Sequence, residues 1–177
     1  MSYHLALGKA FIDFVGGYQE YDVECTAANG GDFDVDSYLI GIGGGVNLGT
    51  FYIKGSAFMG QNVSEYVMGT QTANAPTLGA GNSLNDNDTY GLTLIAGVKA
   101  SDMVTIETGF GYTESELDVA LSNEDDNFAW YLMANITLAP GVTITPEVGY
   151  IDFGDGPVRN IDQGDALYFG LEWRINF

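Results

Sequence analysis

Residues that could carry out a reaction are scarce in this chain of 177 residues. His4 is the only histidine, and no Ser-His or Cys-His constellation can be assembled around it at the start of the chain. The glycines of 41–45 are not followed by the Lys-Ser/Thr pair of a phosphate-binding loop. The sequence therefore predicts neither an enzyme nor a bound cofactor.

One short acidic run has a spacing that calcium loops also use. Asp32, Asp34 and Asp36 alternate with apolar residues, but the run lacks the glycine and the distal glutamate of an EF-hand. We therefore expect a solvated acidic loop and no dedicated metal site, with weak binding of divalent cations as the alternative. Cys25 is the only cysteine, which excludes an internal disulfide and a multi-cysteine metal site. We expect it to be an exposed loop thiol, with intermolecular pairing as the alternative.

The composition excludes two classes of protein. The formal net charge is -19 and the chain has only five Lys and Arg residues, whereas binding to a nucleic-acid backbone requires clustered basic residues. No stretch approaches the roughly 20 apolar residues of a membrane-spanning helix. The 25 glycines and 13% aromatic residues instead suit many strands and tight turns.

The last eleven residues show the pattern around which the chain is organised. Successive side chains on a strand point to opposite faces, so residues of one parity share a face. Glu172 and Arg174 lie on one parity, and the other parity is wholly apolar. The apolar set is Leu167, Phe169, Leu171, Trp173, Ile175 and Phe177. Eight segments alternate in this way, at about 3–18, 38–48, 51–59, 90–98, 104–113, 128–138, 142–150 and 167–177.

Long and short connections alternate between these segments. The long loops are expected at about 19–37, 61–88, 114–127 and 152–165, and tight turns such as Pro140-Gly141 join the other strands. A transmembrane barrel has this asymmetry, with short turns at one end and longer loops at the other. A soluble barrel or sandwich would instead bury its apolar faces. The sequence therefore predicts one all-β domain over residues 1–177, an eight-stranded antiparallel up-and-down transmembrane β-barrel.

Charged residues on the strands fall mainly on the polar parity, which would line the lumen. Ionic groups in a narrow interior must be paired to offset their desolvation, so we expect opposite charges to alternate across it. The predicted luminal charge network comprises Lys9, Asp13, Lys54, Lys99, Glu107, Glu147, Glu172 and Arg174.

The last third of the chain resembles the C-terminal end of Gram-negative outer-membrane barrel proteins of the porin-like kind. It contains Ala139-Pro140-Gly141-Val142, a Pro146 to Tyr150 strand and a terminal aromatic residue above an alternating apolar face. The resemblance implies a bacterial outer-membrane location, contact with the lipid bilayer and lipopolysaccharide, and recognition of Trp173, Ile175 and Phe177 by the barrel-assembly machinery. It assigns no other functional residue.

Two functions fit this interpretation. A complete eight-stranded barrel, expected to be monomeric, would have a lumen filled by side chains and a structural or surface-interaction role through its acidic loops. Alternatively, the chain is all or the C-terminal part of a porin-like protein that passes small solutes, with a preference for cations. Closure predicts that residues 6–14 pair with the C-terminal strand. The start of the chain shows no signal peptide, so we expect a removed signal or a longer protein.

Overall fold

A computed structural model describes residues 2–7, 9–24, 32–65, 75–79, 84–119, 124–155 and 162–176. No helix in these ranges is long and apolar enough to cross a membrane. The elements are β1 (Ser2–Leu7), β2 (Ala10–Glu24), β3 (Asp32–Asn47), β4 (Phe51–Gln61), the 3-10 helix η1 (Val63–Glu65), β5 (Thr77–Leu78), β6 (Leu84–Asn85), β7 (Asn87–Lys99), β8 (Val104–Leu117), β9 (Asp125–Ala139), β10 (Val142–Asp152) and β11 (Asp165–Ile175).

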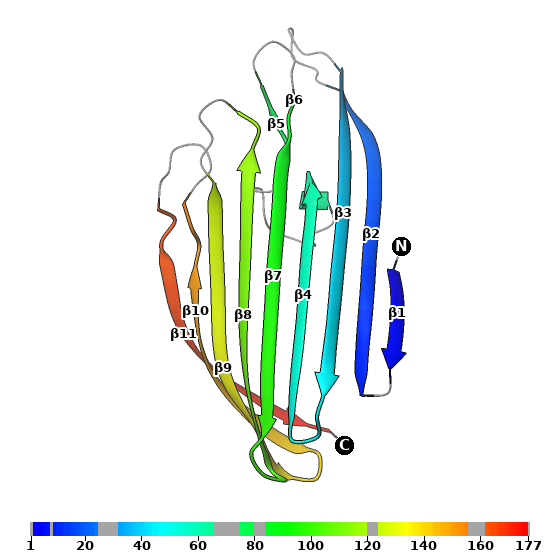
Figure 1. Ribbon diagram of the computed structural model, residues 1–177. Helices are drawn as coiled ribbons and strands as arrows, with labels where there is room; N and C mark the ends of the chain where they lie inside the picture. The colour runs from blue at the N-terminus through cyan, green and yellow to red at the C-terminus, as the bar shows by residue number, and fades with distance from the viewer. Residues whose placement is uncertain are drawn as a thin grey trace.

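Nine strands form one antiparallel sheet in the order β1-β2-β3-β4-β7-β8-β9-β10-β11, while β5 and β6 form a separate pair (Figure 1). Eight of the nine strands contain 11 to 16 residues. A tilted strand needs about 9–11 residues to cross a bilayer, so all eight are long enough. The all-β, antiparallel, up-and-down prediction is confirmed.

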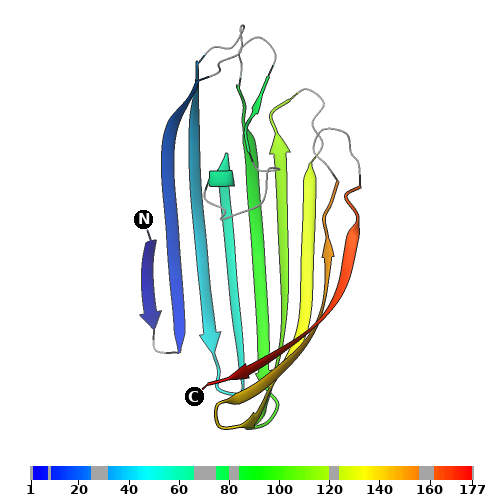
Figure 2. The same cartoon turned by 180° about the vertical axis from the view of Figure 1, so that it is seen from behind.

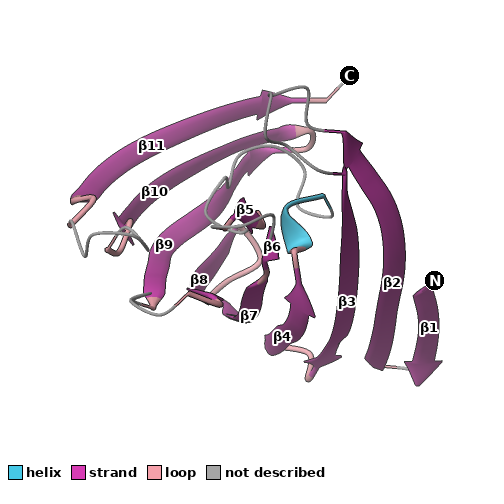
Figure 3. Ribbon diagram, turned by 90° about the horizontal axis from the view of Figure 1, so that it is seen from above, coloured by secondary structure: helices cyan, strands magenta, loops and turns pink. Residues whose placement is uncertain are grey.

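The sheet curves like a trough and remains open between its first and last strands (Figure 3). Within the described ranges, β11 pairs only with β10 and β1 pairs only with β2. Residues 10–14 of β2 are already paired with β1 on one side and with β3 on the other. The predicted pairing of residues 6–14 with the C-terminal strand therefore does not occur. Figure 2 shows the C-terminal end of β11 near the lower ends of the other strands and the N-terminus at mid-height.

The first predicted strand, 3–18, is a hairpin of two strands. Leu7 of β1 pairs directly with Ala10 of β2, so the chain reverses over two residues. Residues that lie opposite each other in an antiparallel pair share a face, so this reversal exchanges odd and even positions. Although the even positions 6–14, predicted as the outward face, are apolar, the exchange explains why the odd positions mix apolar and charged residues.

The predicted loop 19–37 is largely strand, because β2 continues to Glu24 and β3 begins at Asp32. Phe33 and Val35 are 8% and 1% exposed, so the acidic run is an alternating strand with one buried face. Its acids, Asp32, Asp34 and Asp36, lie on the exposed face. No group of three or more metal-ligating side chains converges in the described residues.

Two of the other predicted loops, 61–88 and 114–127, are shorter than expected. Segment 61–88 contains η1, β5 and β6, and β7 begins within it at Asn87. β8 extends to Leu117 and β9 begins at Asp125, so strands enter the predicted loop 114–127 from both sides. The segment 152–165 connects β10 to β11.

The distribution of apolar side chains over the sheet is the reverse of that in a soluble protein. Large apolar side chains stand exposed on its convex face; Ile40, Phe169 and Leu171, for example, are 61%, 77% and 70% exposed. The buried apolar residues of the described chain are few and lie near the loop end of the concave face: Phe33, Val35, Val63 and Leu117. A continuous apolar convex face is unfavourable in water and is what a lipid-facing wall requires.

Candidate functional site on the concave face

Two carboxylates project from the concave face into a group of tyrosines. Tyr131 Oη donates to Glu107 Oε1 at 2.7 Å, and Tyr52 Oη donates to Glu107 Oε2. Tyr168 Oη donates to Glu147 Oε1 at 2.7 Å. We call this set of five residues from β4, β8, β9, β10 and β11 the concave belt. Because hydroxyl donors satisfy the carboxylates, neither needs a basic partner to be hydrogen-bonded.

Glycines on the neighbouring strands make room for the tyrosine rings of the concave belt. Directly opposite Tyr131 is Gly109, where a Cβ would lie 2.2 Å from the ring. The same relation joins Tyr52 to Gly97 and Tyr168 to Gly149. Each ring therefore lies against bare backbone and extends its hydroxyl toward a carboxylate. Sequence reasoning missed the tyrosines, although glycines recurring on the polar parity were the available signal.

Among the described residues, no Lys or Arg forms an ion pair with Glu107 or Glu147 of the concave belt. Lys54 Nζ lies 5.1 Å from the centroid of the Tyr52 ring, a cation-π distance. Lys99 pairs with Asp102 in the following turn at 3.1 Å. Lys9 lies exposed in the turn between β1 and β2.

The predicted luminal network therefore has a different form. Of its members, Glu172 and Arg174 form an ion pair with each other at 2.7 Å. Asp13 lies on β2 and lines a hollow of about 390 Å³ with Ser56 and Phe58. The described contacts do not give the expected alternation of opposite charges, because Glu107 and Glu147 bind tyrosine hydroxyls instead.

A buried polar network turns the chain onto the concave face after β4. Asn62 has a left-handed φ of 53° and is fully buried. Its Nδ2 donates to the carbonyl of Asp36 and to Asp86 Oδ1, each at 2.8 Å, and its Oδ1 accepts from the Asn87 amide at 2.9 Å. The side chain thereby joins the segments around β3 and β7, and η1 follows on the concave side of the sheet (Figure 3).

The same network continues across the sheet. Thr89 Oγ1 donates to Asn87 Oδ1 at 2.8 Å and lies 3.0 Å from Ser115 Oγ. These residues are at most 3% exposed, and Val63 of η1 is also fully buried. The start of the long connection is therefore fixed by satisfied hydrogen bonds rather than held loosely above the sheet.

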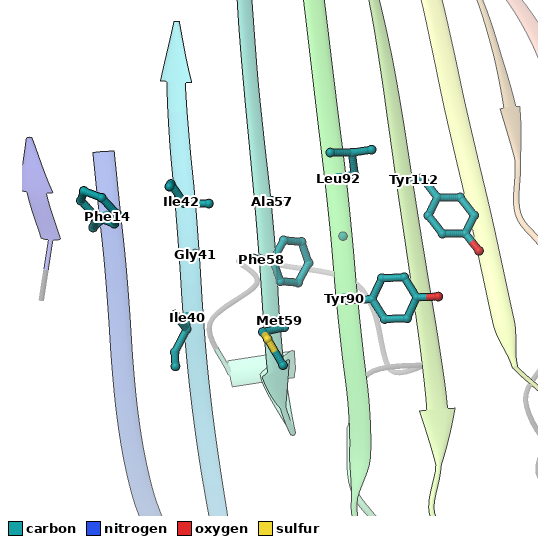
Figure 4. A pocket seen from close by; sticks show the side chains of 11 residues that line it. Phe14, Ile40, Gly41, Ile42, Ala57, Phe58, Met59, Tyr90, Leu92 and Tyr112 are labelled. Carbon is teal, nitrogen blue, oxygen red and sulfur yellow. The ribbon is translucent and has the colours of Figure 1, made fainter. Parts of the chain in front are cut away.

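The convex face carries an apolar hollow of about 650 Å³ over β3, β4 and β7 (Figure 4). Ala57 forms part of its floor, and larger side chains such as Ile42, Leu92 and Tyr90 surround it. Its lining contains no Asp, Glu, Lys, Arg or His. Apart from the hydroxyls of Tyr90 and Tyr112, this lining is apolar and suits hydrocarbon.

Aromatic rings gather toward the loop ends of the strands. The Phe110–Phe128, Phe128–Tyr150 and Tyr90–Tyr112 centroids are 6.2, 5.7 and 6.3 Å apart. Trp173 and Ile175 of the predicted assembly signal are 60% and 47% exposed on β11. Phe177 and Cys25 lie outside the described residues.

Comparison with known proteins bears on the fold. No family model matches the chain, and no curated protein matches it in sequence. Two similar solved structures are the outer-membrane expressed OmpT of Vibrio cholerae and in-vitro folded OmpT, described as an outer membrane protein of Vibrio cholerae in trimer form. The TM-score is 0.65 for each, with 16% and 15% identity. The chain shares their fold.

The similarity covers 98% of this chain and 54% of each OmpT chain. This chain therefore spans about half the length of the structures that it resembles. At this level of identity the likeness concerns the arrangement of strands, and it assigns no activity.

Proposed function

We propose that the chain forms part of the wall of a β-barrel in the bacterial outer membrane, and that its concave face lines a passage for small solutes, with a preference for cations. The proposal rests on the partners of Glu107 and Glu147, which are tyrosine hydroxyls rather than Lys or Arg. Carboxylates without a basic partner on a passage wall attract cations and repel anions.

The edges of the sheet support a passage larger than this chain alone encloses. Neighbouring strands are antiparallel, so in a sheet of nine strands β1 and β11 run in the same direction. They cannot pair antiparallel with each other, yet unpaired edges are not tolerated in lipid. If an odd number of further strands completed the barrel, both edge strands, β1 and β11, would have an antiparallel partner. The OmpT structures, which are nearly twice as long, are consistent with such completion.

The partners under this proposal follow from the convex face. Its apolar side chains would contact the bilayer and lipopolysaccharide. The barrel-assembly machinery would recognise Trp173 and Ile175 on β11. The acidic tips of the strands would offer weak sites for divalent cations. A monomer remains our expectation for the chain alone, and the trimer form of one OmpT structure makes association the alternative to test.

Ion conduction tests the proposal directly. In planar bilayers with a KCl gradient, we expect current steps whose reversal potential shows a preference for cations. Glu107→Gln and Glu147→Gln should each weaken this preference. Asp118→Asn removes the same charge from an exposed position beyond β8 and should leave it nearly unchanged. Anion preference, or equal effects of all three substitutions, would contradict a selective role for the concave belt.

A closed barrel with a structural or surface-interaction role is the second candidate. It is favoured by the short β1, which contributes six register pairs against fifteen between β2 and β3. Without β1, the edge strands β2 and β11 would run in opposite directions and could pair. Silence in planar bilayers, together with a disulfide between Ile12→Cys and Leu171→Cys in a Cys25→Ser background, would support this candidate.

A further inference from the structure

Asp125, the first residue of β9, is a buried carboxylate with an unsatisfied oxygen. Its side chain is 2% exposed, and in the described part of the chain Oδ1 has no hydrogen-bond partner. Burial of an ionised carboxylate without a donor is costly, because the charge loses its hydration and gains nothing in return. The surroundings of Asp125 therefore favour its neutral, protonated form.

A short segment beyond β10 covers this carboxylate. Gly154 has a φ of +69°, and a Cβ there would lie 1.9 Å from the Asp126 carbonyl oxygen and 3.0 Å from Asp125 Oδ1. We call residues 153–155 and 162–164 the rim segment. Its two halves are joined by backbone hydrogen bonds and a β-bridge: Phe153 N to Gly164 O at 3.0 Å, Gln163 N to Gly154 O at 2.8 Å, and Asp155 paired with Asp162.

The charged groups around Asp125 are acidic. Burial, and then the negative charges of Asp126 on β9 and Asp155 on the rim segment, raise the pKa of Asp125 to about 6. The charged residues at nearby strand positions are also acids. Glu114 and Glu116 lie on either side of Ser115, the residue of β8 that pairs with Asp125. Asp152 is the last residue of β10, and Asp162 pairs with Asp155. No ion pair to Asp125 occurs among the described residues.

Asp125 lies outside the part of β9 that would cross the membrane. β9 has 15 residues, several more than the roughly 9–11 that a spanning strand needs. Phe128 belongs to the cluster of aromatic rings that would mark the interface, and Asp125 lies three residues farther toward the loop end. The Asp125 carboxylate therefore lies at the loop end of β9, on the side of the external solution.

We propose that the rim segment docks on β9 when Asp125 carries a proton and is released when Asp125 is ionised, so that this part of the barrel mouth responds to pH. A proton fits the site better than a metal ion, because no group of three metal-ligating side chains converges in the described residues. This device goes beyond the proposed passage and does not require that the barrel conducts.

The direction follows from linkage between ionisation and docking. A carboxyl group with a pKa of about 6 when docked, against 3.8 when free, binds its proton more tightly in the docked state. Docking is then fully favoured below pH 3.8, is lost as the pH rises toward 6, and is weakest above it. The interval of about two pH units corresponds to at most a change on the order of 100-fold in the docking equilibrium, because the Asp126 charge on the same strand remains after release.

Amide hydrogen exchange of Gly154 in the refolded full chain in detergent micelles measures docking, because docking buries Gly154 against the Asp126 carbonyl of β9. After correction for intrinsic rates, we expect its protection to fall by at most about 100-fold between pH 4 and pH 7. Asp125→Asn should keep the acid-like protection at every pH. Asp155→Asn, which removes one neighbouring charge, should move the midpoint to lower pH.

Several outcomes would overturn the proposal. One is a pH response that persists in Asp125→Asn, and another is protection that rises with pH. Restoration of wild-type protection at pH 8 by CaCl2 would assign the site to a divalent cation instead. Arg159 lies outside the described residues; loss of neutral-pH protection in Arg159→Gln would assign an ion pair. Asp118→Asn, at the same end of the sheet, should behave as wild type.

Discussion

Two acidic regions of the same sheet differ in what their carboxylates face. On the concave belt, Glu107 accepts from two tyrosine hydroxyls and Glu147 from one. At the loop-side tip of β2 and β3, acids lie directly opposite acids, in the register pairs Glu20 with Asp36 and Asp22 with Asp34. Like charges opposite each other weaken a strand pair, whereas charge-assisted hydrogen bonds strengthen it. The same residue type therefore stabilises one region and destabilises the other.

The difference arises from the glycines beneath the concave belt. A tyrosine ring can lie across the neighbouring strand only where that strand has no side chain, as at Gly97, Gly109 and Gly149. The tip of β2 and β3 has no glycine in its register pairs. Its acids therefore stand side by side, and Tyr18, whose hydroxyl donates to Asp36 Oδ1 at 2.6 Å, gives one of them a donor.

Filling a glycine of the concave belt should have the largest effect on stability. In Gly109→Val, the new side chain would occupy the place of the Tyr131 ring, and overpacking of this kind costs about 1–3 kcal/mol. Gly111 is the matched control on the same strand, because a Cβ there meets nothing within 4 Å. Urea unfolding in micelles, followed by tryptophan fluorescence, measures both. Equal destabilisation of the two variants would show that the ring contact is unimportant.

Removing one hydroxyl should have an intermediate effect. Tyr131→Phe deletes a 2.7 Å hydrogen bond to the half-buried Glu107, and we expect a loss of about 1–2 kcal/mol in the same unfolding assay. Tyr150→Phe deletes a similar bond of 2.8 Å to the exposed Asp165, and water can replace that donor. Its cost should stay below about 0.5 kcal/mol. A larger loss in Tyr150→Phe than in Tyr131→Phe would remove the distinction between the concave belt and the exposed pair Tyr150–Asp165.

The sequence was sufficient for the fold where one face of a strand is uniformly apolar. The pattern located β4 and β7 to β11 within a few residues. Apolar residues at every second position, such as Leu92, Leu94 and Ala96, match the two-residue period of a strand. The reversal between Leu7 and Ala10 was missed because a two-residue turn leaves hydrophobicity high while it exchanges parity. Closure depends on strand pairs that no local pattern encodes.

The site was only partly predictable for a related reason. Glu107 and Glu147 were placed on the correct face by parity, but their tyrosine partners lie on other strands. Register decides which residues meet, and a shift of one position would have changed every contact. The acidic run of Asp32, Asp34 and Asp36 was expected to be a solvated loop, with weak cation binding as the alternative, although its spacing equally makes an alternating strand with Phe33 and Val35 buried.

Reversing one charge at the acidic tip should give the smallest effect, with the opposite sign. Asp34→Lys replaces a carboxylate that faces Asp22 with a cation, which turns a repulsive pair into an attractive one. We expect a gain of about 0.2–1 kcal/mol for that strand pair, measured as slower amide exchange at the tip of β2 and β3. The gain should shrink in 1 M salt, because the Debye length falls to about 3 Å. Slower exchange that is independent of salt would mean that strand propensity, rather than charge, limits the tip.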